Sequence, residues 1–211
     1  MSNINLQFIE VCSGAGGLST GFCNNNFIPI LLNDHDKTCC DTLKQNHKNC
    51  EVIRDTFTNI DFSEYHNIDV LMGGVPCQSF SQAGKRKGLD DKRGNLLLDF
   101  IKLVEKITPK VFLIENVKGL ITHNNGETFD KIKQKLNNIN KYNIHYKVLN
   151  SNNYNVPQKR ERLFIVGTLK TFSNDFVFPE EQEYKPILKD VLLNVPESQG
   201  YEYPESKKNI M

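Results

Sequence analysis

The feature that most constrains this chain is the alternation of apolar and helix-like stretches over its first two-thirds. Strand-like segments rich in apolar residues span 6–12, 27–33, 50–55, 68–74 and 110–117. The intervening or following stretches have the pattern of helices and span 16–25, 36–47, 95–107 and 126–139. Near-continuous apolar strands joined by helices indicate a parallel sheet that is covered on both faces. The sequence therefore predicts an α/β fold with a mostly parallel sheet.

The pattern changes toward the C-terminus. Strand-like segments at 145–154 and 162–169 are separated by only a short loop. Because a parallel connection needs a long crossover, this pair is predicted to be antiparallel. From about residue 170 the chain is rich in proline and acidic residues, with one short helical candidate at 186–194. We predict one domain over 1–170, followed over 171–211 by a linker or extended arm.

Composition narrows the class of protein. The 211 residues are 38% hydrophobic and 24% charged, which is ordinary for a globular domain with a real core. No apolar run approaches the roughly 18 residues that span a bilayer, and the N-terminus lacks the pattern of a secretory signal. The six cysteines include no C-x2-C pair of the kind found in zinc sites. We therefore predict a cytoplasmic protein with no membrane partner.

A glycine turn and two acids follow the first three strands. Gly14, Gly16 and Gly17 link the first strand to a helix, where glycine allows close approach of a ligand and the helix offers free N–H groups. The spacing is not the G-x-G-x-x-G of dinucleotide enzymes. Asp34 and Asp55 end the next two strands, where carboxylates can accept ribose hydroxyls and an adenine amino group. Each acid alone could be a helix cap, but together they favour an adenosine-containing cofactor.

Cys77 is a candidate nucleophile. It follows the fourth strand, lies between Pro76 and Gln78, and precedes a stretch, 85–94, with five basic and two acidic residues. A thiol reacts as the thiolate, which nearby cations stabilise. The alternative is a buried structural cysteine, and the polar flanking residues argue against it. The basic stretch alone is equally typical of a solvated loop.

Three further charged residues are candidates for the site. Glu115 lies near the end of the fifth strand, where an unpaired glutamate is costly to bury. A raised pKa would make this glutamate a proton donor. Arg160 and Arg162 are two apart on a predicted strand, so they are expected on one face and able to orient a carboxylate or phosphate. The alternative for the two arginines is an exposed basic edge. Carboxyl ends of parallel strands meet at one edge of a sheet, so these candidates are expected close together.

Four segments resemble, in order and spacing, the motifs of DNA (cytosine-5)-methyltransferases of the bacterial restriction–modification type. They are FIEVCSGAGGLSTGF, GGVPCQSFSQAGKRKGLDDKRGNLLLDF, KVFLIENVKGL and LNSNNYNVPQKRERLFIVG, between about residues 6 and 169. The resemblance implies a Rossmann-like methyltransferase fold that depends on S-adenosyl-L-methionine, and double-stranded DNA with a flipped cytosine as the substrate.

The resemblance also implies roles for the candidate residues. Cys77 resembles the nucleophile that adds to carbon 6 of cytosine, and Glu115 resembles the residue that contacts the base at N3 and its amino group. Arg160 and Arg162 resemble the pair that holds the base and orders the site. The stretch 85–93 resembles a mobile loop that closes on DNA phosphates.

The cofactor residues are implied in the same way. The residues at the cofactor positions of the family are Cys12, Gly14, Ala15, Gly16, Gly17, Asp34, His35, Asp55, Thr56, Pro76 and Leu96. All of them match the family pattern except Cys12 and His35. Cys12 stands where the family usually has phenylalanine, and His35 where a bulky residue is common. Either change is expected to loosen cofactor packing without touching the chemistry.

Family members usually continue with a target-recognition domain, and this sequence stops where that domain would begin. We therefore expect methyl transfer to require a complementing C-terminal partner. The main alternative is a catalytically silent remnant that binds only cofactor or partner. Transfer to transfer RNA and a nicotinamide dehydrogenase are weaker alternatives, because the loop after Cys77 is bacterial-like and Pro-Cys-Gln has no place in a dehydrogenase.

Overall fold

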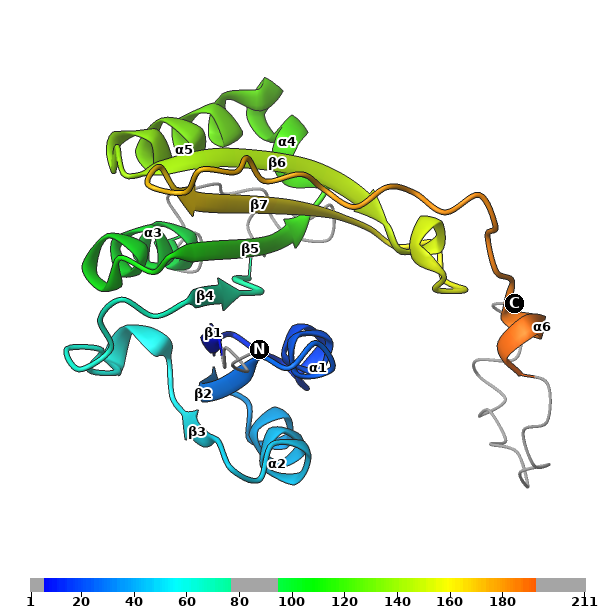
Figure 1. Cartoon of the computed structure of the whole chain (residues 1–211), viewed down its shortest axis with the longest axis horizontal. Helices are drawn as coiled ribbons and strands as arrows, with labels where there is room; N and C mark the ends of the chain where they lie inside the picture. Colours follow the sequence, from blue (N-terminus) through cyan, green and yellow to red (C-terminus); the bar gives the residue numbers. More distant parts are fainter. Residues whose placement is uncertain (1–5, 77–94, 193–211) are drawn as a thin grey trace. The chain divides into compact units, whose positions relative to one another are not determined.

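A computed structural model of the chain describes residues 6–76 and 95–192 (Figure 1). The described residues belong to two compact units, one with 6–76, 95–149 and 161–180 and the other with 150–160 and 181–192. Cys77 and the basic stretch 85–94 lie outside the described residues. No helix in the described ranges combines the length and the apolar composition needed to cross a bilayer.

The first unit is built around a seven-stranded sheet with the order β3-β2-β1-β4-β5-β7-β6. The strands are β1 Gln7–Val11, β2 Ile28–Asp34, β3 Glu51–Arg54, β4 Val70–Gly73, β5 Val111–Val117, β6 Tyr142–Asn150 and β7 Glu161–Leu169. Neighbouring strands from β3 to β5 are parallel, and β7 is antiparallel to β5. Figure 1 shows β6 and β7 running in opposite directions. The predicted α/β class, with a mostly parallel sheet and an antiparallel pair at its end, is confirmed.

The α-helices are α1 Gly17–Cys23, α2 Lys37–Asn46, α3 Asn95–Ile107, α4 Gly119–Thr122, α5 Glu127–Asn138 and α6 Leu188–Val191. Short 3-10 helices span Phe57–Asn59, His123–Gly126 and Ser151–Tyr154. The observed α3 has the predicted bounds. The strand predicted at 145–154 instead begins at Tyr142 and ends at Asn150, because the Asn150 side chain caps the following 3-10 turn by accepting from Asn152 N.

Both faces of the sheet are buried. On one face, Leu43 of α2 and Phe22 of α1 pack with apolar residues of β1, β2 and β4. On the other face, α3 and α5 pack over the sheet in a larger cluster that includes Phe100 and Leu136. Because helices cover both faces of the sheet, the polar loops gather at the carboxyl ends of β1, β2, β3 and β4.

Candidate cofactor and active site

The turn after β1 has a backbone that only particular residues adopt easily. Gly14 and Gly16 have φ of +56° and +89°, and Gly16 N donates to Ser13 O at 3.0 Å. A Cβ atom on Gly14 or Gly17 would meet no heavy atom within 4 Å, so the turn borders open space. Ala15, between them, is exposed. This geometry fits a ligand lying against the backbone of the turn.

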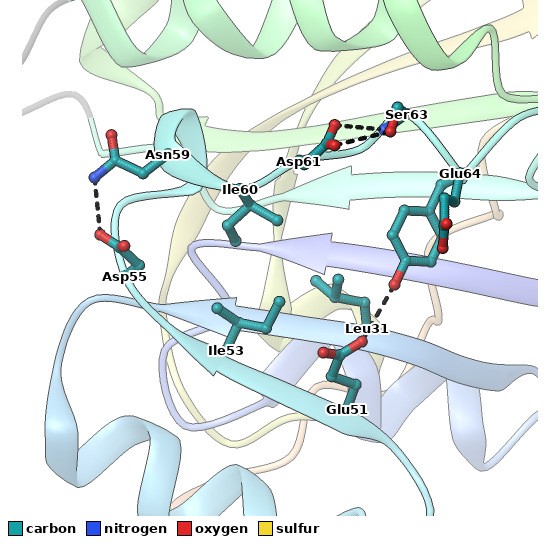
Figure 2. Close-up of a pocket in the computed structure, with 10 residues that line it drawn as sticks. Leu31, Glu51, Ile53, Asp55, Asn59, Ile60, Asp61, Ser63 and Glu64 are labelled. Atoms are coloured by element: carbon teal, nitrogen blue, oxygen red, sulfur yellow. Dashed lines mark hydrogen bonds between the residues drawn. The ribbon is translucent and has the colours of Figure 1, made fainter.

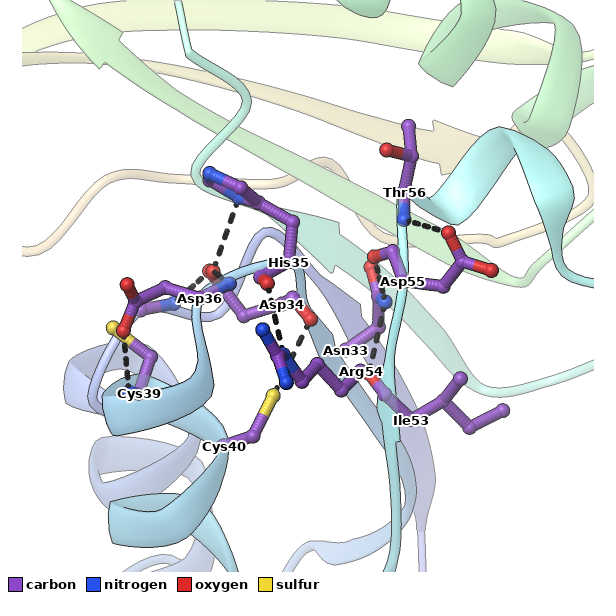
Figure 3. A network of polar contacts seen from close by, with 11 residues as sticks. Asn33, Asp34, His35, Asp36, Cys39, Cys40, Ile53, Arg54, Asp55 and Thr56 are labelled. Carbon is purple, nitrogen blue, oxygen red and sulfur yellow. Dashed lines mark hydrogen bonds and ion pairs between the residues drawn. The ribbon is translucent and has the colours of Figure 1, made fainter.

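Asp34, at the end of β2, is bonded to that turn. Figure 3 shows Asp34 beside His35 and Asp36. Its Oδ2 accepts from Gly14 N at 2.8 Å, and its Oδ1 accepts from Asp36 N at 2.9 Å. The exposed His35 ring places Nδ1 3.3 Å from the same Oδ1. A carboxylate has about four acceptor positions, so Asp34 retains capacity for ribose hydroxyls.

Asp55 follows β3 and lies next to Asp34, because Asp55 N donates to Asp34 O at 3.2 Å. Its Oδ1 accepts from Thr56 N at 2.6 Å and from Asn59 Nδ2 at 3.0 Å. Nothing in the described ranges donates to its Oδ2. Thr56 therefore contributes its backbone N–H to holding the carboxylate, and Oδ2 is available to a ligand amino group.

A surface pocket of about 370 Å³ adjoins Asp55 (Figure 2). Its apolar floor includes Leu31 and Ile53, and Glu51 lies at the far end of β3 within hydrogen-bond reach of the Tyr65 hydroxyl, at 3.2 Å. Asp55 is consequently reachable from solvent on this side of the edge strand.

The cofactor candidates Cys12, Pro76 and Leu96 are partly buried. Burial raises the pKa of the Cys12 thiol to about 12, and the negative charges of Asp34 and Glu10 add to the effect. Cys12 is therefore a neutral, apolar filler. Pro76 and Leu96 are half-buried, and Leu96 packs against the larger core cluster.

Glu115 and Arg162 form an ion pair across two strands. Arg162 is opposite Val117 in the antiparallel β5–β7 register, and Val117 shares a face of β5 with Glu115. Arg162 Nε lies 2.9 Å from Glu115 Oε1, with 25% and 22% of the two side chains exposed. Glu115 is therefore not the unpaired glutamate considered from the sequence.

Arg160 does not lie on that strand. It precedes β7, which begins at Glu161, and it belongs to the second compact unit. The prediction that Arg160 and Arg162 share a strand face was therefore wrong, because the strand begins one residue too late to include Arg160.

The ion pair lies beside the segment that leads to Cys77. Glu115 Oε2 is 3.9 Å from the position of a Cβ on Gly74. The next residue, Asn116, is 2% exposed and donates from Nδ2 to Val75 O at 3.2 Å. Asn116 thereby ties β5 to the backbone two residues before Cys77, a contact that sequence reasoning missed although an amide next to Glu115 was visible.

Two more polar residues escaped the sequence analysis. Asn33 and Glu10 are each 1% exposed, within strands that are otherwise largely apolar. A polar residue in an apolar run was the available signal for both. Glu10 contacts Ser19 of α1, and Asn33 contacts the end of β3.

The chain is similar to known proteins over nearly its whole length. The family model for C-5 cytosine-specific DNA methylases matches residues 6–209. The Type II methyltransferase M.Eco47II of Escherichia coli is 38% identical over 221 residues, covering 100% of this chain and 53% of the relative. M.AquIA of Picosynechococcus is 39% identical over 189 residues, covering 82% of this chain and 75% of the relative.

A solved structure shows the same fold. A DNA modification methyltransferase encoded within an E. coli prophage superposes with a TM-score of 0.78 at 26% identity, over 92% of this chain and 56% of that one. The predicted methyltransferase fold is thus confirmed. The chain spans about half the length of M.Eco47II. With the family model matching nearly its whole length, this chain belongs to the C-5 cytosine-specific DNA methylase family.

Proposed function

We propose that this chain is the catalytic, cofactor-binding part of an enzyme that transfers a methyl group from S-adenosyl-L-methionine to carbon 5 of cytosine in double-stranded DNA. The observation that carries the proposal is the Glu115–Arg162 ion pair beside Gly74, three residues before Cys77. A partly exposed carboxylate paired with a guanidinium suits recognition of the polar edge of a flipped base.

The residues at the strand ends fit the cofactor. The turn at Gly14–Gly17 borders open space, where the amino-acid part of the cofactor can lie against the backbone. Asp34 would accept the ribose hydroxyls, and Asp55 Oδ2 the adenine amino group. His35 and Thr56 border this region, while Cys12, Pro76 and Leu96 supply apolar walls. The bound cofactor supplies an electrophilic methyl group.

The chain's own part in the reaction follows from thiol chemistry. The Cys77 thiolate adds to carbon 6 of the flipped cytosine, which makes carbon 5 nucleophilic. Glu115 stabilises the adduct by contacts to N3 and the exocyclic amino group, and Arg162 holds the base. After carbon 5 has taken the methyl group, it loses its proton to a base, and elimination at carbon 6 releases Cys77.

The setting of the enzyme is part of the proposal. A bacterial restriction–modification system, a cytoplasmic location and an arm over 171–211 that follows the domain over 1–170 fit the family. Because the chain spans about half the length of M.Eco47II, we propose that target recognition requires a complementing C-terminal part.

The test is covalent capture on duplex DNA containing 5-fluorocytosine, with S-adenosyl-L-methionine present. The chain is assayed alone and with the separately produced half of M.Eco47II that it does not match. We expect a covalent complex that Cys77→Ala abolishes and Cys39→Ala retains. A complex that survives Cys77→Ala contradicts the mechanism. Cofactor binding without any covalent complex under both conditions supports the silent remnant instead.

A further inference from the structure

We infer that Asn33 is a positioning residue that sets the spacing between Asp34 and Asp55 in the cofactor site. The inference rests on the proposed function, because it assigns these two acids to one ligand. Asn33 touches neither acid's carboxylate and acts through the backbone of three neighbouring strand ends.

The geometry links β1, β2 and β3 at one level of the sheet. Asn33 pairs with Val11 of β1 and with Ile53 of β3 in the strand register. Its Nδ2 donates to Ile53 O at 3.0 Å and to Asp55 O at 2.8 Å (Figure 3). The backbone oxygen of Asn33 accepts from Ser13 N at 2.9 Å.

An amide is an unusual choice for this position. Asn33 is 1% exposed and follows two fully buried leucines, and asparagine is depleted in strands. Burying an amide is costly unless its donors are satisfied. Here both N–H groups are used, on the two carbonyls that flank Arg54, the last residue of β3. The side chain therefore clamps the point at which the edge strand ends.

The clamp acts on both acids. Asp34 is the next residue in β2, and its backbone oxygen accepts from Asp55 N at 3.2 Å, while Asn33 holds the carbonyl of the same Asp55. Ser13, held by Asn33 O, precedes Gly14, whose N–H donates to the Asp34 carboxylate. Loss of the amide would leave the end of β3 held only by backbone bonds to β2. Asp55 would then be held less firmly at the position where it meets the adenine while Asp34 meets the ribose.

The test measures binding to the full chain by titration calorimetry, which does not require turnover. The probes are S-adenosylhomocysteine and its purine analogue without the 6-amino group. Asn33→Ala is the main variant, and Asn33→Ser, whose hydroxyl can reach at most one carbonyl, is the second. Asn25→Ala is the matched control, because Asn25 Nδ2 also donates to a backbone carbonyl, Gly21 O at 2.9 Å, but at the surface.

For wild type and Asn25→Ala, we expect the analogue to bind about tenfold more weakly than S-adenosylhomocysteine. For Asn33→Ala, we expect S-adenosylhomocysteine to bind about tenfold more weakly and the difference between the two ligands to shrink toward onefold, with Asn33→Ser between. General loss of stability would weaken both ligands alike and keep their ratio, so it would not imitate this result.

Two results would overturn the inference alone: a wild-type ratio retained in both Asn33 variants, or failure of both variants to fold, which would make the amide structural only. A wild-type chain that binds neither ligand would overturn the proposed function, and the inference with it.

Discussion

Glu10 shows how one buried residue makes folding depend on pH. Burial in β1 raises the pKa of Glu10 to about 8; hydrogen bonds from Ser19 oppose this shift, and the charge of Asp34 adds to it. No residue in the described ranges bonds to Glu10 Oε2. The folded chain therefore holds a proton on Glu10 that the unfolded chain releases near pH 4.5.

The resulting prediction concerns the free energy of unfolding. A raised folded-state pKa stabilises the fold fully below about pH 4.5, and this stability is lost as the pH rises to about 8. The loss attributable to Glu10 is at most about 1.4 kcal/mol per pH unit. Urea denaturation between pH 5 and pH 8 should show that Glu10→Gln removes this slope, whereas the exposed Glu64→Gln keeps it. Equal slopes for Glu10→Gln and wild type would contradict the prediction.

Arg162 carries the second prediction at this scale. Arg162→Ala would leave Glu115 without its guanidinium and should slow covalent capture of 5-fluorocytosine DNA by about a hundredfold. Arg162→Lys keeps the charge but not the planar donors, so an intermediate rate is expected. Stability should change by no more than about 1 kcal/mol, because both side chains of the pair are partly exposed. Lys141→Ala, remote from the pair, is the control, and an unchanged rate for Arg162→Ala would refute the assignment.

At the scale of elements, the connection from β1 to α1 depends on Gly16. Its φ of +89° disfavours any side chain, and a Cβ there would lie 2.9 Å from Leu43 Cδ2 and 3.0 Å from Ser19 Oγ. The Leu43 methyl is the end of a flexible side chain and can yield, so backbone strain is the larger part of the cost. The turn, α1 and α2 are therefore packed as one group around a position without a side chain.

Gly16→Ala should destabilise the fold by about 1–2 kcal/mol and weaken binding of S-adenosylhomocysteine. Gly21→Ala is the matched control within α1, since a Cβ there meets nothing within 4 Å. Alanine is a better helix former than glycine, so the free energy of unfolding of this control should rise by about 0.5–1 kcal/mol. Thermal melting and calorimetric titration of Gly16→Ala and Gly21→Ala test the prediction. Similar effects of the two substitutions would contradict it.

At the scale of the whole sheet, the antiparallel addition of β7 to β5 depends on Gly167. Gly167 lies opposite Phe112, and a Cβ on it would be 2.0 Å from Phe112 Cε1. The Phe112 ring meets Tyr142 of β6 edge-on at 5.0 Å, and the Tyr142 hydroxyl donates to Pro109 O at 2.8 Å. One ring thus joins three strands because the residue beneath it has no side chain.

Gly167→Ala should lower the free energy of unfolding by about 1–3 kcal/mol, because the Phe112 ring must leave its place in a close-packed core. Combining it with Phe112→Leu should restore part of the loss, so the double variant should be more stable than Gly167→Ala alone. Chemical denaturation of the two single variants and the double variant measures this coupling. Strictly additive effects would show that the two residues do not act on each other.

The sequence by itself determined the class of fold and the identity of the motifs. Apolar runs are local patterns, and so is helical spacing, which is why α3 was predicted with its observed bounds. The motifs are short runs of neighbouring residues as well, and their order along the chain is enough to indicate the methylase family.

Only the tertiary structure decided how residues distant in the chain meet. The pairing of Glu115 with Arg162 follows from the β5–β7 register, and the exclusion of Arg160 from that strand follows from where β7 begins. The clamp at Asn33 depends on two carbonyls about twenty residues away. Local patterns say which residues form a strand, but register and cross-strand bonds depend on the packing of all the elements together.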